Sequence, residues 1–173
     1  MNVKRLNGIL EILFDQMNGS RNEEKEIPVL WHVAHLYSSL QIAKILAMKR
    51  GLNIELSAII AAFHDIAVIR TKKAKDHSEN AEKYIREIIQ EYNNNINNTR
   101  LQVTEEELDI IINAAIKHTQ KEILSNELYV ELLKDVDSLD MYLHGIEINE
   151  DCILRSNKAI EELGISLDKL KYV

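Results

Sequence analysis

The segment that most constrains this chain is the run Ala58–Phe63, in which every residue is apolar. A helix over 54–67 would be apolar on nearly every side, so we expect it in the centre of a helical bundle. The same helix ends with the pair His64 and Asp65. An ionised carboxylate costs on the order of several kcal/mol in an apolar interior unless a partner compensates it, so this pair requires a partner.

Residues that break helices are rare along the whole chain, which has five Gly and one Pro. Leu, Ile, Glu, Lys and Ala are abundant, and because these are mostly good helix formers, the sequence predicts an all-α protein. A chain of 173 residues suffices for one domain with a core, so we predict a compact single-domain bundle over 1–173. We expect about six to seven helices, over 2–17, 29–50, 54–67, 77–92, 104–118, 125–143 and 149–162.

Start and stop signals support several of these boundaries. Asp76 with Glu79, and Thr104 with Glu107, have the spacing of a capping box, in which an N-cap acceptor precedes Glu by three residues. Ser125 is the expected cap of the helix over 125–143. The predicted stops are Gly51, the asparagine cluster at 93–98, Gly145 and Gly164.

Charge and cysteine content narrow the class of protein. The net charge of −7 argues against a general nucleic-acid-binding surface, although a local basic patch could hold a small phosphorylated ligand. Cys152 is the one cysteine, which excludes an internal disulfide and fits a reducing compartment. No apolar run reaches the roughly 18 to 20 residues of a membrane span, and the amphipathic N-terminus lacks a cleavage-site pattern. We expect a cytoplasmic protein with no membrane or nucleic-acid partner, and a homodimer stays open.

Imidazoles and carboxylates also occur at inward-facing positions of other predicted helices. His35 lies mid-helix with apolar residues along the same side. The segment LLKDVDSLDMYL carries three aspartates within or beside an apolar pattern. Together with the His64-Asp65 pair, these groups need a shared compensation. A divalent metal ion, bound by neutral imidazole nitrogen and carboxylate oxygen, is the most economical one.

The order His35, then His64-Asp65, then Asp137 resembles the HD superfamily of metal-dependent phosphohydrolases, which is named after its His-Asp pair. The surrounding sequence matches as well: H-x7-A-x3-A begins at His35, a glycine closes that helix, and A-A-x-H-D-I occupies 61–66. The similarity extends from about His35 to Leu143, within a core of about 29–145. The helices over 2–17 and 149–162 are expected to pack on this core.

This resemblance implies a set of metal ligands. The first divalent ion would be held by His35, His64, Asp65 and Asp137. Members with two metals, including bacterial diadenosine tetraphosphate hydrolases and cyclic-di-nucleotide phosphodiesterases, carry further histidines in the intervals where this chain has His77 and His118. Those two would hold a second ion, with Asp65 bridging. Without a second ion they would bind substrate phosphate or position water.

Several assignments stay open at this point. His32 lies one turn before His35 and could face the same way, although the alanine spacing favours His35. Asp135 and Asp140 compete with Asp137, which corresponds to the family's ligand position. The sequence does not distinguish Fe, Mn, Mg, Co, Zn and Ni.

The implied activity is hydrolysis of a phosphoric ester or anhydride by metal-activated water, with Asp65 and His64 as catalytic residues. Basic residues close to the motif are candidates for binding substrate phosphate. They are Arg70, Lys72, Lys73 and Lys117, and Lys121 also flanks His118. A small phosphorylated metabolite, with a nucleotide favoured, is the expected substrate. The alternatives are a di-iron oxygenase on the same fold and a non-catalytic metal-binding domain for sensing or interaction.

Overall fold

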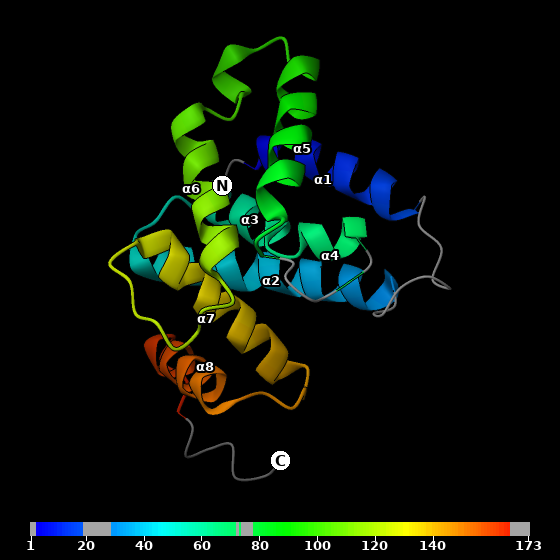
Figure 1. The fold of residues 1–173 in the computed structure, drawn as a ribbon. Coiled ribbons are helices and arrows are strands. Elements are labelled where there is room, and N and C mark those ends of the chain that lie inside the picture. The colour runs from blue at the N-terminus through cyan, green and yellow to red at the C-terminus, as the bar shows by residue number, and fades with distance from the viewer. Residues whose placement is uncertain (1–2, 19–28, 72, 74–77, 167–173) are drawn as a thin grey trace.

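The computed structural model describes residues 3–18, 29–71, 73 and 78–166, and these ranges contain helices and no strand, which confirms the all-α prediction. Figure 1 shows the helices packed across one another in several directions. They are α1 (Lys4–Asn18), α2 (Val29–Arg50), α3 (Ile54–Phe63), α4 (Ile66–Thr71), α5 (Ala81–Asn95), η2 (Thr99–Leu101, a 3₁₀ turn), α6 (Glu105–Lys117), α7 (Leu128–Leu143) and α8 (Glu150–Glu162).

Helix α3 lies at the centre, as its apolar sequence predicts. Every residue from Leu56 to Phe63 is buried. The helix contacts α1, α2, α6 and α7, and Figure 1 shows it surrounded by them. Its N-terminus is capped by Asn53, whose side chain accepts a hydrogen bond from the backbone NH of Leu56. The carboxyl end of α3 is thereby fixed deep inside the molecule.

The predicted helix over 54–67 is divided in two, which corrects the sequence prediction. Helix α3 ends at Phe63, His64 and Asp65 form a turn, and α4 begins at Ile66. The apolar pattern gave no sign of this break, because the first four residues of α4 are also buried. Nδ1 of His64 lies 2.7 Å from the carbonyl oxygen of Ala61. This hydrogen bond occupies a carbonyl at the end of α3 and fixes the imidazole ring there.

Several predicted boundaries are confirmed. Thr104 and Glu107 form a complete capping box at the start of α6. Asn149 caps α8, which ends at Glu162, and a positive φ angle at Gly51 (66°) allows the chain to turn sharply after α2. Gly145 and Gly164, with φ of 71° and 80°, follow α7 and α8 in the same way.

Two predicted helix starts are wrong. Helix α5 begins at Ala81 instead of 77, and Asp76, its expected cap, lies outside the described residues. Helix α7 begins at Leu128, because Ser125 hydrogen-bonds Glu127 in the loop and does not cap the helix. At its other end, α5 continues to Asn95, inside the asparagine cluster that was expected to stop it.

The two outer helices are attached by ion pairs and apolar packing. Arg5 of α1 contacts Glu55 at 2.8 Å and Glu107 at 2.7 Å, so it links α1 to α3 and α6. Helix α8 packs along α7. Among the described residues, no helix combines the length and the apolar character needed to cross a bilayer.

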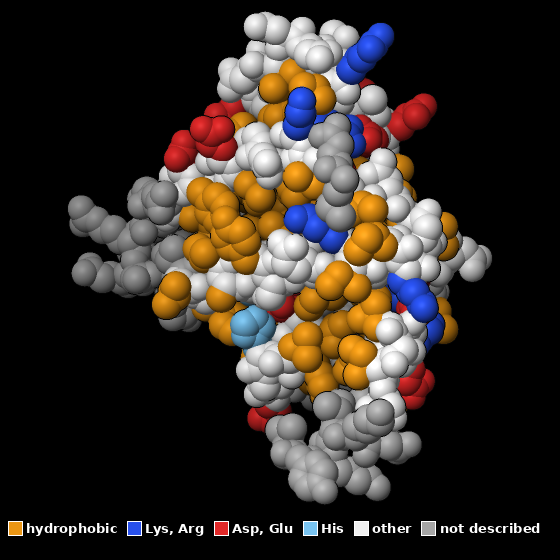
Figure 2. All heavy atoms as spheres, turned by 180° about the vertical axis from the view of Figure 1, so that it is seen from behind, with side chains coloured by type: hydrophobic (Ala, Val, Ile, Leu, Met, Phe, Trp, Pro, Cys, Tyr) orange, Lys and Arg blue, Asp and Glu red, His pale blue; other side chains and the backbone are white. Residues whose placement is uncertain are grey.

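Hydrophobic side chains also reach the surface. Figure 2 shows the face opposite that of Figure 1, where they gather across the middle and acidic side chains lie mostly toward the edges. Leu128, Leu143 and Leu154, from α7 and α8, are among the exposed ones. Exposed apolar area of this kind is typical of interaction surfaces when it is contiguous. The homodimer stays a prediction.

Candidate metal centre

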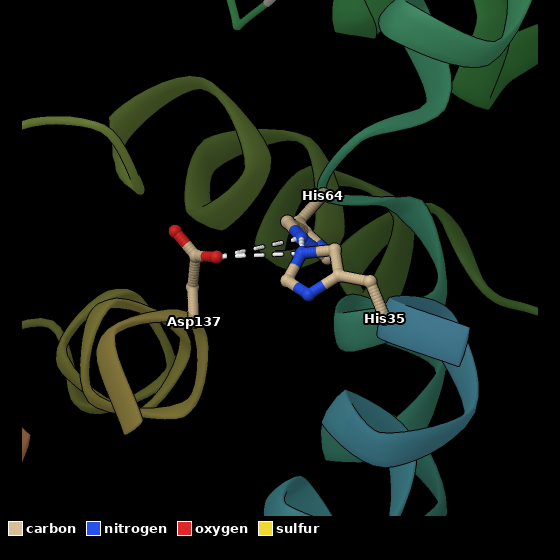
Figure 3. A group of neighbouring side chains, drawn as sticks. All are labelled: His35, His64 and Asp137. Carbon is tan, nitrogen blue, oxygen red and sulfur yellow. Dashed lines mark hydrogen bonds and ion pairs between the residues drawn. The ribbon is translucent and has the colours of Figure 1, made fainter. Parts of the chain in front are cut away.

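Three buried side chains from three helices point at one another. They are His35 of α2, His64 at the end of α3 and Asp137 of α7, and Figure 3 shows their polar ends converging. The Nε2 atoms of the two histidines are 2.8 Å apart. Oδ1 of Asp137 lies 3.5 Å from Nε2 of His35 and 3.7 Å from Nε2 of His64. The ligand atoms of these three side chains all lie within 4.8 Å of one another.

The other ring nitrogen of each histidine already has an acceptor. Nδ1 of His35 is 2.5 Å from Oδ2 of Asp140, and Nδ1 of His64 is 2.7 Å from the carbonyl of Ala61. We assign the protons to both Nδ1 atoms, since a carboxylate and a carbonyl can only accept here. Both Nε2 atoms then direct lone pairs at each other and toward Asp137. A bound cation in place of a shared proton would satisfy this convergence, and nitrogen with carboxylate oxygen suits a divalent transition metal.

Asp65 adds two carboxylate oxygens beside this cluster, and they face different histidines. Oδ2 lies 3.7 Å from Nε2 of His35 and 3.6 Å from Nε2 of His64. Oδ1 lies 3.9 Å from Nε2 of His118, at the end of α6. Nδ1 of His118 is 2.6 Å from the carbonyl of Ala115, so its Nε2 is also left as an acceptor. The Asp65 side chain is 23% exposed, whereas both His35 and His64 are almost fully enclosed.

The electrostatic environment keeps the carboxylate charged and one imidazole neutral. Burial alone would raise the pKa of Asp137, but Lys121, His64 and His118 hold it well below its usual range. Burial is also the main reason that the pKa of His118 falls to about 3. A neutral imidazole beside an ionised carboxylate is the protonation state that metal ligands need.

The pKa of His35 is raised, whereas that of His118 is lowered. Burial of His35 opposes protonation, but the hydrogen bond to Asp140 and the charges of Asp65 and Asp137 outweigh burial and raise its pKa. The surroundings of this ring are thus strongly negative. A metal ion would meet the same negative field in place of a proton.

The three aspartates of α7 have different partners. Asp135 forms ion pairs of 2.7 Å with Arg50 and with Arg155. Asp140 holds Nδ1 of His35. Asp137 is the one that reaches the cluster. This is the assignment that the family's ligand position implied.

The structure also places the two neighbouring histidines of α2 differently. His35 belongs to the cluster, whereas His32 is buried one turn earlier and does not belong to the group of possible metal ligands. The indole of Trp31 stacks on the His35 ring, with 5.9 Å between ring centroids and 10° between the planes. Trp31 therefore forms a wall beside the first ligand.

A pocket of about 400 Å³ opens onto this centre. Its polar end holds His35, Asp65, His118, Lys121 and Asp137, and its apolar wall consists of Trp31, Val68, Met141, Ile146 and Cys152. A larger hollow of about 640 Å³ borders α1 and α5, but its described lining contains neither an imidazole nor a basic residue. We therefore take the smaller pocket as the candidate site.

The basic residues predicted to bind phosphate lie elsewhere or are not described. Arg70 pairs with Glu87 at 2.9 Å, and Lys117 pairs with Glu127 at 2.5 Å. Lys73 is exposed, and none of these three lines the pocket. Lys72 and the predicted second-metal ligand His77 lie outside the described residues.

Lys121 is the basic residue that the structure brings to the centre. Its Nζ donates a hydrogen bond of 2.7 Å to Oδ2 of Asp137, and its side chain is 7% exposed. The sequence places Lys121 only in a polar segment after His118, and no periodic pattern there shows which way a side chain points. Its position beside His118 makes it one of the basic residues near the motif, and the structure adds the direction of its side chain toward Asp137.

The chain is an all-α protein with a buried group of histidine and aspartate side chains that could hold a metal ion, and a His-Asp pair follows its central helix. The sequence pattern of the HD domain family matches residues 33–142, well over half of the chain, and the protein belongs to this family. No curated protein and no solved structure matches the chain significantly.

Proposed function

We propose that this HD domain is a metal-dependent phosphohydrolase that acts on a small phosphorylated metabolite, with nucleotides as the first substrate class to test. The observation that carries this proposal is the convergence of the Nε2 atoms of His35 and His64 with the ionised carboxylate of Asp137, beside a pocket that His35 and Asp137 line. The ion would be held by Nε2 of His35, Nε2 of His64, Oδ1 of Asp137 and Asp65. When bound, a divalent ion lowers the pKa of water and polarises a phosphoryl group.

The protein's own residues supply orientation around this ion. Asp65 is the most accessible of the four proposed ligands, so its carboxylate is the group that orients the attacking water from the pocket. His64 is locked by Ala61 and His35 by Asp140, which keeps their Nε2 atoms in place. The apolar wall lowers the polarity on one side of the pocket and thereby strengthens the electrostatic interactions beside it.

A second ion is part of the proposal, because the two oxygens of Asp65 lie closest to different histidines. Oδ2 faces His35 and His64, while Oδ1 faces His118. This is the arrangement expected of a carboxylate that bridges two metals. His118, neutral and fully enclosed, would be a ligand of the second ion.

The test combines elemental analysis of the purified protein with phosphate release from a panel of nucleotides, dinucleoside polyphosphates and other phosphorylated metabolites. We expect bound divalent metal and turnover of at least one compound. Asp65→Ala should abolish turnover, and Asp109→Ala, on the exposed side of α6, is the matched control. Metal-loaded protein that releases phosphate from no panel member would refute the hydrolase.

The same bridging geometry favours one alternative activity. A pair of irons held on the two sides of Asp65 would suit an oxygenase. That protein would contain two irons and would consume oxygen with an organic substrate. A chain that binds metal but shows neither reaction would be a sensing or interaction domain.

A further inference from the structure

Lys121 hydrogen-bonds one carboxylate oxygen of Asp137. The other oxygen of Asp137 faces the two histidines, where the proposed ion would bind. Nζ of Lys121 lies 2.7 Å from Oδ2 of Asp137, whereas Oδ1 of Asp137 faces His35 and His64. Asp137 therefore joins the ammonium group to the proposed ion without sharing one oxygen between them. Lys121 also lines the pocket through which a phosphorylated substrate would reach the centre.

The hydrogen-bonding capacity of Lys121 is not used up. An ammonium group donates three hydrogen bonds. Lys121 gives one to Asp137 and one, at 3.3 Å, to the carbonyl of Lys134. Within the described part of the chain no acceptor takes the third, and Lys121 lines the pocket. Of the described residues that line this pocket, it is also the one Lys or Arg.

The loop that carries Lys121, residues 118–127 between α6 and α7, is held by a cation from α8. Nε of Arg155 donates a hydrogen bond of 2.7 Å to the carbonyl of Lys121, and another guanidinium nitrogen lies 3.3 Å from the carbonyl of Ile123. Glu131 and Asp135 of α7 fix the guanidinium at 2.9 and 2.7 Å. Arg155 thus connects the loop backbone to α7 and to its own helix, α8.

Helix α8 lies beyond the family match, which ends at residue 142. Cys152, Arg155 and Ala159 lie at three- and four-residue steps on the buried side of α8. This side faces α7, so the guanidinium group of Arg155 contacts Glu131 and Asp135. The anchor of the Lys121 loop is therefore a feature of this chain outside the matched region.

We propose that Lys121 binds the phosphoryl group of the substrate and that Arg155 is its positioning residue. The inference rests on the proposed phosphohydrolase function. Lys121 donates its third hydrogen to a phosphoryl oxygen, and its charge offsets the negative charge that the phosphate brings beside Asp65 and Asp137.

Inorganic phosphate, titrated calorimetrically into the metal-loaded full-length protein, is the direct probe. Lys121→Met keeps the length of the side chain and removes the ammonium group, so phosphate affinity should fall about 10- to 100-fold with the metal content unchanged. Lys117→Met is the matched control, because Lys117 pairs with Glu127 outside the pocket, and it should bind phosphate like the wild type. Lys121→Arg should recover part of the affinity.

Arg155→Gln tests the positioning role. It should weaken phosphate binding in the same direction with the metal retained, and in the hydrolysis assay it should raise KM more than it lowers kcat. Thermal unfolding of the same samples establishes that the variants are folded. Arg155→Gln that is folded and binds phosphate like the wild type would remove Arg155 from the proposal.

The outcomes separate this inference from the hydrolase itself. Wild-type phosphate affinity in Lys121→Met, or loss of the metal from that variant, would overturn the role of Lys121. Hydrolysis with a wild-type KM in Lys121→Met would do the same and leave the hydrolase standing. Phosphate binding that depends on Lys121, in a protein that hydrolyses no panel compound, would support the inference and refute the hydrolase.

Discussion

Asp140 is a single carboxylate that would orient the proposed metal ligand His35 without itself contacting the ion. It is 1% exposed, and its Oδ2 holds Nδ1 of His35 at 2.5 Å. The hydrogen bond fixes the tautomer and the direction of Nε2, and the negative charge makes that nitrogen a stronger donor to a cation. Asp140 would therefore contribute to metal binding through His35, which stands between it and the proposed ion.

Asp140→Ala should lower the affinity for the metal by about 10- to 100-fold, the usual cost of removing such a partner. Asp140→Asn keeps an acceptor oxygen but not the charge, so it should fall between the alanine variant and the wild type. Competition with a chromogenic chelator measures the dissociation constants. An alanine variant with the wild-type constant would show that His35 needs no orienting partner.

The lowered pKa of His118 leads us to expect that acid destabilises the metal-free protein. Histidine has an ordinary pKa of 6.5, and burial in the fold lowers the pKa of His118 to about 3. Between these values the unfolded chain binds a proton that the folded chain does not, so the free energy of unfolding falls as the pH is lowered through this window. The loss is on the order of a few kcal/mol across the window.

Urea unfolding of chelator-treated protein at several pH values between 4 and 7 tests this. The contribution of His118 is the part of the pH dependence that disappears in His118→Gln. The raised pKa of His35 acts with the opposite sign and is present in both proteins, so it cancels in their difference. Equal slopes for the two proteins would show that His118 does not titrate as its burial requires.

The residues of the centre could be predicted to different extents from the sequence. His35, the His64-Asp65 pair and Asp137 are recognisable because a family pattern of order and spacing connects them. For Lys121 the sequence gives the position beside His118 but not the direction of the side chain, because that direction is set by a loop whose carbonyls bind Arg155, and that contact spans 34 positions of the chain. Spacing arguments work within a helix and give no information on a loop held by a distant side chain.

At the scale of helices, the sequence predicted the cap of α6 correctly and that of α7 wrongly, because the two candidate caps have different hydrogen-bond partners. Thr104 caps α6 because its side chain accepts from Glu107 and the Glu107 carboxylate accepts from the Thr104 backbone in return. Ser125 has a residue type that is common at N-caps. Its hydroxyl, however, donates to the Glu127 carboxylate and accepts from the Glu127 backbone NH, and Glu127 lies between Ser125 and the helix. The break between α3 and α4 was not predictable from periodicity, since both sides of it are buried.

Thr104→Ala should destabilise the protein by about 1 kcal/mol, because it leaves a backbone NH of α6 without its acceptor. The site lies at the opposite end of this helix, so the metal content should not change. Thr99→Ala, the same substitution on an exposed residue of η2, should stay within about 0.5 kcal/mol. Denaturant unfolding compares the two variants, and equal effects would mean that the capping box contributes nothing measurable.

At the scale of the whole molecule, the metal centre joins parts of the chain that are far apart in sequence. Its proposed ligands come from α2, from the turn after α3 and from α7, so the unfolded chain has no preformed site. An ion that binds only the folded state stabilises it by mass action, by about 2.7 kcal/mol at a free concentration of 100 times the dissociation constant.

Removing the metal should therefore lower the melting temperature, and adding it back should restore the original value. His35→Gln should make the melting temperature independent of metal, because it removes a ligand supplied by α2 and leaves the α3 turn and α7 without their common partner. His32→Gln, a buried substitution one turn away on the same helix, is the matched control and should keep the metal response whatever its own effect on stability. A metal response in His35→Gln as large as in the wild type would place the stabilising ion elsewhere in the protein. If the melting temperature became independent of metal in His32→Gln but not in His35→Gln, His32 would be the ligand in place of His35. Measuring both variants therefore tests the first ligand and the linkage between metal binding and folding together.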